Sequence, residues 1–299
     1  MSAAARLISP QTLAGLANLE LLARVVVEGA LIGLHRSPRF GFSQEFAEYR
    51  AYTPGDDPRF IDWNVFARAD RTYVKRFFGT TNTRLTVLVD TSASMGVPAS
   101  PGAVSKLDYA RFLAAALIHV AARQHDAVGL SAFAGEVHVQ RPPAARARAI
   151  QALYHDLDGL RAAGGTHWSA LFEHAAGRLG KRGLTVLLSD CFCAPEELGA
   201  GLRALAARGH DLLVFQILDP AERQPSAAGG TTLEDVETGV TLTVSAGDLA
   251  RDYPQRLAEH VAQIRHAVLG AGGHHRLMSS DEPLDQSLAE YLRFRERHP

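Results

Sequence analysis

Oxygen-bearing side chains alternate along one short stretch of this sequence. Residues 86–96 read TVLVDTSASMG, in which an apolar run stops at Asp90 and hydroxyls follow at Ser92 and Ser94. If the chain stays roughly extended, positions separated by two point the same way, so the carboxylate and both hydroxyls face one point. Hard oxygen donors are the ligands that Mg²⁺ or Ca²⁺ prefers. The stretch therefore predicts part of a site for a divalent cation.

Two further oxygen donors are expected near this point. Thr166 lies in the Gly-containing stretch AAGGTHWSAL, and Asp190 ends a second apolar run. Ligands of open parallel sheets bind beyond the carboxyl ends of the strands, where the strand order reverses. A cap on the following helix is the alternative role for Asp90 and Ser92, but the Pro- and Gly-containing stretch VPASPGAVS intervenes. We therefore predict a metal site made of Asp90, Ser92, Ser94, Thr166 and Asp190.

The elements that would position these residues alternate along the chain. Strands that are apolar throughout, separated by helices, indicate a parallel sheet that is covered on both faces. The predicted fold class is α/β, with a doubly wound, mainly parallel, Rossmann-like sheet flanked by helices. The predicted strands are 84–90, 126–135, 137–142, 183–190 and 210–219, and the predicted helices are 105–124, 145–160, 168–180, 195–209 and 247–269, with a β-ribbon over 231–245.

The pattern changes at both ends of this alternation. Residues 10–35 have apolar positions at helical spacing, and the stretch up to residue 80 is rich in Arg, Asp, Phe and Tyr and is expected to be extended. We predict a helix and β-rich extension over 1–80, the α/β domain over 81–275, and a helical C-terminal tail over 276–299.

Composition narrows the classes of function. The 299 residues are 46% hydrophobic and carry a net charge of −1, so no polyanionic partner is expected. Arg residues over 36–84 alternate with acidic ones, which leaves no basic stripe for nucleic acid. Cys191 and Cys193 cannot build a disulfide framework and are expected to be semi-buried, while His274 and His275 are expected in a solvated loop. With no spanning or targeting segment in view, we expect a cytoplasmic protein.

The candidate site resembles that of a known class of domain. Asp90-Thr91-Ser92-Ala93-Ser94, Thr166 and Asp190 are similar to the DxSxS…T…D metal-ion-dependent adhesion site of von Willebrand factor A-type domains. Upstream, SQEFAEYRAYTPGDDPRFIDWNVFARADRTYVKRF is similar to the GDDxRxIDWxxxAR signature of the bacterial family called domain of unknown function 58. The resemblance covers about residues 36–220.

This resemblance implies a von Willebrand factor A-like domain whose function is protein–protein contact. The implied cofactor is Mg²⁺, with Ca²⁺ or Mn²⁺ as alternatives, and a protein partner would supply an acidic side chain to the metal. Members of the family are associated with MoxR-type AAA+ ATPases, so such an ATPase or its client is the implied partner. No nucleic acid and no membrane span are expected.

The Arg- and Asp-rich signature block over 36–76 has two interpretations. Its charged residues can form ion pairs that fix the block against the α/β domain, which is the interpretation we favour. The alternative is a partner-binding surface, since Arg and Trp are enriched at interaction hot spots. The candidate residues for that surface are Arg50, Asp57, Arg59, Trp63 and Arg68.

A metal-dependent hydrolase or phosphoryl-transfer enzyme is the alternative function. Aspartyl-phosphate phosphatases also have a strand that ends in Asp, but they need a second Asp two residues later, where this chain has Ser92. The sequence contains no Gly-x-x-x-x-Gly-Lys phosphate loop. His167, beside Thr166, is the one candidate base. We therefore predict a binding module and no catalytic residues.

Overall fold

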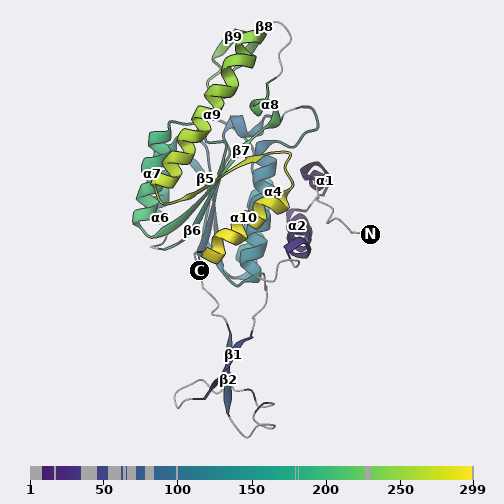
Figure 1. Cartoon of the computed structure of the whole chain (residues 1–299), viewed down its shortest axis with the longest axis vertical. Coiled ribbons are helices and arrows are strands. Elements are labelled where there is room, and N and C mark those ends of the chain that lie inside the picture. Colours follow the sequence, from purple (N-terminus) through teal and green to yellow (C-terminus); the bar gives the residue numbers. More distant parts are fainter. Residues whose placement is uncertain are drawn as a thin grey trace.

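A six-stranded sheet forms the centre of the protein in the computed structural model (Figure 1), which describes residues 9–16, 18–34, 46–52, 62, 65, 72–77, 84–98, 100–178, 180, 182–225 and 230–297. The strand order is β10-β7-β6-β3-β4-β5. Neighbouring strands are parallel except for the antiparallel pair of β4 and β5. The strands are β3 (Arg84–Asp90), β4 (Ala127–Phe133), β5 (Val137–Ala144), β6 (Gly183–Ser189), β7 (His210–Leu218) and β10 (His274–Ser279).

Helices cover both faces of this sheet, which explains why the central strands are apolar throughout. Two clusters of buried apolar side chains lie on the sheet. Figure 1 shows one group of helices on each side. One face carries α2 (Leu19–Leu34), α4 (Lys106–Arg123), α5 (Ala147–Gly159) and α10 (Leu284–Arg297), and the other carries α6 (Trp168–Arg178), α7 (Pro195–Ala207) and α9 (Ala246–Gly270). The predicted fold class is confirmed.

The N-terminal helix α2 is part of the packed structure. Its residues Leu22, Ala23, Val26 and Val27 are buried in the larger apolar cluster, and α2 packs on α4 and α10. Because α4 lies between the sheet and α2, it is buried almost all round, which its many Ala and Leu residues allow. The short helix α1 (Pro10–Ala14) precedes α2.

The C-terminal segment also belongs to the central sheet. β10 pairs in parallel with β7 from His274 opposite Leu213 to Ser279 opposite Leu218, so the predicted domain boundary at 275 falls inside a strand. The segment after it is helical, as predicted, and α10 buries Leu288 and Tyr291 in the core. The strand is added because its own apolar residues, with those of α10, cover an edge that β7 would otherwise expose.

The expectation of a solvated loop at His274 and His275 is wrong, because both lie in β10. The His274 ring contacts Phe294 edge-on, with the ring centroids 4.9 Å apart. Nε2 of His275 lies 3.0 Å from Oε1 of Gln216. A pair of adjacent His residues does not by itself distinguish a loop from a strand that later elements of the chain bury.

Small elements complete the described structure. β1 (Phe46–Ala51) and β2 (Tyr73–Phe77) form an antiparallel pair, in agreement with the predicted β-rich extension. β8 (Gly230–Glu234) and β9 (Thr241–Ser245) form a second such pair, as the predicted ribbon requires. The one-turn elements η2 (Ala93–Gly96) and α8 (Pro220–Arg223) follow β3 and β7. None of the helices in the described part of the chain combines the length and the apolarity needed to cross a bilayer.

The candidate partner-binding residues Asp57, Arg59, Trp63 and Arg68 lie outside the described residues. The backbone of Arg50 is in β1, opposite Val74.

Close packing of α6 against α7 depends on a glycine. A Cβ atom at Gly201 would lie 1.9 Å from Cδ2 of Phe172, and Phe172 is buried and stacked on Trp168. We expect Gly201→Ala to lower the free energy of unfolding by about 1–3 kcal/mol through overpacking. Chemical denaturation measures this, with Gly177→Ala as the matched helical control, since a Cβ there meets nothing within 4 Å. Equal stability of the two variants would contradict the tight α6–α7 contact.

Candidate metal centre

The candidate site lies where the strand order reverses. From β3 the chain proceeds to β4 on one side of it and later enters β6 on the other side. Val89 of β3 is paired with Leu188 of β6, so the carboxyl ends of both strands are level. Asp90 is the last residue of β3, and Asp190 directly follows β6. The sheet therefore brings the two predicted carboxylates together at its carboxyl edge.

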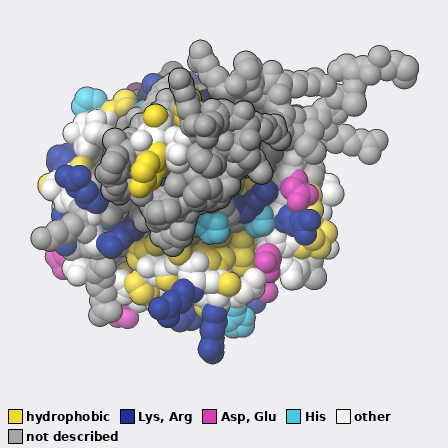
Figure 2. All heavy atoms as spheres, turned by 90° about the horizontal axis from the view of Figure 1, so that it is seen from below, with side chains coloured by type: hydrophobic (Ala, Val, Ile, Leu, Met, Phe, Trp, Pro, Cys, Tyr) yellow, Lys and Arg dark blue, Asp and Glu magenta, His cyan; other side chains and the backbone are white. Residues whose placement is uncertain are grey.

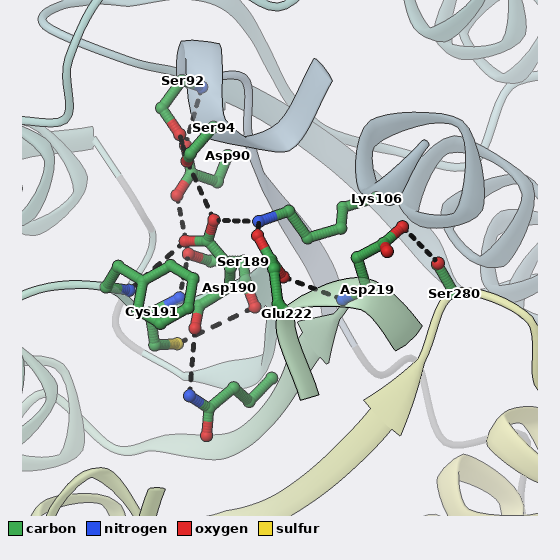
Figure 3. A network of polar contacts seen from close by, with 12 residues as sticks. Asp90, Ser92, Ser94, Lys106, Ser189, Asp190, Cys191, Asp219, Glu222 and Ser280 are labelled. Atoms are coloured by element: carbon green, nitrogen blue, oxygen red, sulfur yellow. Dashed lines mark hydrogen bonds and ion pairs between the residues drawn. The ribbon is translucent and has the colours of Figure 1, made fainter. Parts of the chain in front are cut away.

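All five predicted metal ligands are joined by one chain of hydrogen bonds, most of which Figure 3 shows. The Ser92 N–H donates to Oδ1 of Asp90 at 2.9 Å, and the hydroxyl oxygens of Ser92 and Ser94 are 3.0 Å apart. Ser94 Oγ donates to Oδ2 of Asp190 at 2.8 Å. Thr166 Oγ1 donates to Oδ1 of Asp90 at 3.4 Å.

Backbone contacts fix the loop that carries Thr166. The Ala93 N–H donates to the carbonyl of Gly164 at 2.8 Å, and the Ala163 N–H donates to that of Thr91 at 2.9 Å. Gly164 has a φ of 73°, a conformation that favours glycine. A Cβ at Gly96 would lie only 2.6 Å from Cβ of Ala162. Glycines thus allow η2 and the Thr166 loop to approach each other closely, and the loop brings Thr166 Oγ1 within 3.4 Å of Asp90.

A sharp turn follows Asp190. Cys191 has a φ of 55°, which is uncommon for a residue other than glycine. Its N–H donates to Ser189 Oγ at 2.9 Å, and its carbonyl accepts from Nε2 of His260 at 2.9 Å. The Phe192 N–H donates to Oδ1 of Asp190 at 3.3 Å. These contacts turn the chain away from the sheet and hold the carboxylate of Asp190 toward Ser94.

Burial and mutual repulsion disfavour negative charge on the two carboxylates of the site. Asp90 is 1% exposed and Asp190 is 2% exposed. Burial, followed by the nearby charge of Asp190, raises the pKa of Asp90 to about 7. Ser189 Oγ, which was not predicted as a site residue, donates to Oδ2 of Asp90 at 2.6 Å. A cation between the two carboxylates would relieve the repulsion that these hydrogen bonds only partly offset.

A buried lysine that was not predicted as a site residue contacts one of these carboxylates. Nζ of Lys106, a fully buried side chain, lies 2.8 Å from Oδ2 of Asp190 and also contacts Oε1 of Glu222. Burial by itself lowers the pKa of Lys106, but the charges of Asp190 and Glu222 outweigh it and raise this pKa above its ordinary value. Lys106 is therefore a fixed positive charge beside the predicted metal ligands. The signal for Lys106 in the sequence is that it is the single lysine of α4 and lies in the first turn of a helix rich in Ala and Leu.

Glu222 connects this lysine to the end of β7. Its Oε2 accepts from the Asp219 N–H at 2.8 Å, and Asp219 Oδ1 accepts from the Ala221 N–H at 2.9 Å, forming a capping box on α8. Ser280 Oγ donates to Oδ2 of Asp219 at 3.3 Å. The site is thus braced from β3, β6, β7 and the end of β10 (Figure 3).

The donor set fits a hard divalent cation. The convergent atoms are hydroxyl and carboxylate oxygens, which Mg²⁺ accepts readily. Among the described residues, no three His, Cys, Asp or Glu side chains gather as a metal cluster, so binding would depend on the hydroxyls of Ser92, Ser94 and Thr166. Burial raises the pKa of the Cys191 thiol, which disfavours the thiolate that a soft metal needs.

The fold and the site define an α/β protein with a buried, oxygen-lined polar site at the switch point of a mostly parallel sheet. The family model described as protein of unknown function DUF58 matches residues 48–263. The chain belongs to this family.

Relatives of this protein match it along most of its length. The uncharacterized protein Rv1480 of Mycobacterium tuberculosis is 29% identical over 294 residues, which are 95% of this chain and 89% of that protein. Among solved structures, the conserved hypothetical protein BatB of Bacteroides thetaiotaomicron has a TM-score of 0.48 at 14% identity, covering 72% of this chain and 99% of that chain. The SpRpn10 VWA domain has a TM-score of 0.40 at 11% identity, covering 70% and 94%.

Proposed function

We propose that this protein is a non-enzymatic protein-interaction module of the von Willebrand factor A type. It binds Mg²⁺ through Asp90, Ser92, Ser94, Thr166 and Asp190 and uses that metal to capture an acidic side chain of a protein partner. The observation that carries the proposal is the convergence of these oxygens at the switch point, joined by hydrogen bonds of 2.8–3.4 Å.

The chemistry of the donor set supports capture of a carboxylate. Mg²⁺ keeps several water ligands and demands near-octahedral geometry, so a site with few protein carboxylates leaves positions for exchange. When bound, the metal would supply a Lewis-acidic position that a partner's carboxylate can occupy. Ser94 and Thr166 are partly exposed, unlike the buried Asp90, so this side of the site is the one open to a partner.

The proposed partner is a MoxR-type AAA+ ATPase or its client protein, and the proposed location is the cytoplasm. The partner follows from the resemblance of the signature block over 36–76 and of the metal motif to the family. The location is supported by two cysteines that form no disulfide, Cys191 and Cys193.

The alternative function is a metal-dependent hydrolase or phosphoryl-transfer enzyme. It is less well supported because the position two residues after Asp90 is Ser92, which supplies no general acid. The side chain of His167 is exposed, and the backbone N–H of this residue donates to the Ala134 carbonyl at 3.2 Å. Turnover of phosphomonoesters or carboxylic esters in the presence of Mg²⁺ would favour this alternative.

Nucleic-acid binding has little support from charge. Figure 2 shows one end of the molecule, where Lys and Arg side chains of the described residues stand at separate places with hydrophobic and His side chains between them. The net charge of −1 agrees with this scatter, since nucleic-acid affinity depends on clustered cations.

Titration with Mg²⁺ tests the proposal. We expect calorimetry to show binding to the wild-type protein and about 100-fold weaker or undetectable binding to Asp90→Ala, because a carboxylate ligand is lost. The matched control is Asp211→Ala, an exposed aspartate near the start of β7 and so at the opposite edge of the sheet. Equal Mg²⁺ affinity of the wild-type and Asp90→Ala proteins, or no binding to either, would overturn the proposal.

A further inference from the structure

A carboxylate from a distant part of the chain contacts the loop of the candidate site. Glu237 lies in the turn between β8 and β9, and its Oε2 accepts from the Thr166 N–H at 3.3 Å. Thr166 in turn donates through Oγ1 to Asp90 at 3.4 Å. Gly165 leaves room for this approach, since a Cβ there would lie 3.3 Å from the same oxygen of Glu237. An acidic side chain of this protein is thus linked through Thr166 to the carboxylate of Asp90.

The β8–β9 turn is built so that Glu237 points toward the site. Asp235 Oδ1 accepts from the Glu237 N–H at 2.9 Å, and Asp235 Oδ2 accepts from Thr238 Oγ1 at 2.6 Å. Gly239 follows with a φ of 72°. Glu237 is half-buried, whereas Val236 and Thr238 on either side of it are exposed. The turn therefore directs the carboxylate inward and its neighbours outward.

The apolar side chains of the hairpin contribute little to holding it in place. Leu233, Val236, Val240 and Leu242 are all exposed, the last two by 65% and 62%. Hydrophobic stabilisation scales with the apolar area removed from water, so these residues do little to anchor the hairpin. The polar contact of Glu237 with the Thr166 loop is consequently an anchor that a competing group can displace.

We infer that Glu237 is an internal acidic ligand of the metal site, which a partner's carboxylate must replace. This inference rests on the proposed function, because it takes the metal to be bound by the five predicted residues. In the structure Glu237 contacts the Thr166 N–H, and negative charge on the nearby carboxylates weakens that contact. A bound divalent cation reverses that local field, so metal binding draws the hairpin toward the site and closes it. A partner with a carboxylate of its own competes for the same position.

Titration with Mn²⁺ alone, read by calorimetry and by hydrogen exchange of the hairpin, tests this inference. The proteins to compare are the wild type, Glu237→Gln and the control Glu234→Gln, which alters an exposed glutamate of β8 in the same hairpin. We expect Glu237→Gln to weaken Mn²⁺ binding about tenfold, because the charge of the ligands sets the affinity of such sites. We also expect Mn²⁺ to slow exchange over 230–245 in the wild type and in Glu234→Gln, and to leave it unchanged in Glu237→Gln.

The outcomes separate this inference from the proposed function. Mn²⁺ binding of equal affinity in all three proteins, with equal hairpin protection, would overturn the role of Glu237 and leave the metal site intact. Absence of Mn²⁺ binding to the wild type would overturn both. Glutamine keeps the size of the side chain, and an unchanged melting temperature of the metal-free variant verifies that the fold is preserved.

Discussion

Replacing Lys106 by Met is expected to lower the free energy of unfolding of the metal-free protein by about 3–5 kcal/mol. The change removes the ammonium that contacts Asp190 at 2.8 Å and also Glu222. Breaking a buried ion pair from one side leaves uncompensated charge in a poorly solvated place, which is far more costly than losing a surface pair. Asp190 is only 2% exposed, so water cannot solvate it in the variant. Denaturation in the presence of a chelator measures the loss.

The same variant is expected to bind Mg²⁺ more tightly than the wild type. Lys106 and a divalent cation both neutralise Asp190, so removing the lysine leaves the metal as the main counter-charge. Added Mg²⁺ should therefore restore part of the stability of Lys106→Met, by the linkage between ligand binding and folding. The stabilising effect of Mg²⁺ on the wild type should be smaller.

The double variant Lys106→Met/Glu222→Gln provides the control. Neutralising Glu222 removes one of the two carboxylates that lose their cation in Lys106→Met, so the double variant should be more stable than Lys106→Met alone. The coupling free energy between the two sites should be about 0.5–3 kcal/mol. Stability of Lys106→Met equal to that of the wild type, or an Mg²⁺ affinity that does not rise, would contradict the role of Lys106 as the fixed cation of the site.

Asp90→Asn is expected to abolish Mg²⁺ binding and, at pH 8, to stabilise the metal-free protein by about 2–3 kcal/mol. Burial and the charge of Asp190 raise the pKa of Asp90 from 3.8 to about 7 in the folded chain. The ionised carboxylate therefore destabilises the fold, and the neutral amide avoids that cost. Ser189 Oγ can still hydrogen bond to the side chain by turning its hydroxyl.

The pH dependence of this effect has a definite sign. Between about pH 4 and pH 7 the folded chain holds a proton on Asp90 that the unfolded chain has lost, so the stability contributed by this group falls as pH rises through that range. The advantage of Asp90→Asn should be full above pH 7 and should vanish near pH 4. Urea denaturation of both proteins with chelator, at several pH values, measures the difference. If the difference in stability between the two proteins stayed constant across this pH range, ionisation of Asp90 would not be its source.

The local sequence predicted most of the fold and the five oxygen-bearing residues of the candidate site. Apolar runs such as 84–90 and 183–190 identify strands buried on both faces, since only a sheet covered on both sides tolerates them. Asp90, Ser92 and Ser94 are adjacent along the chain, so their common direction follows from local backbone geometry. Asp190 and Thr166 could be added because strand ends of a parallel sheet meet at one edge.

Only the tertiary structure assigned the charged groups around those oxygens. Lys106, Glu222 and Glu237 come from a helix, a one-turn element and a hairpin, and each is an ordinary charged residue in its own segment. Their contacts with Asp190 and Thr166 exist because elements far apart in the sequence pack at the same sheet edge. The same reason explains β10, whose place beside β7 depends on pairing with a strand some 60 residues earlier. Local patterns indicate what a residue can do, whereas long-range packing decides which partner it meets.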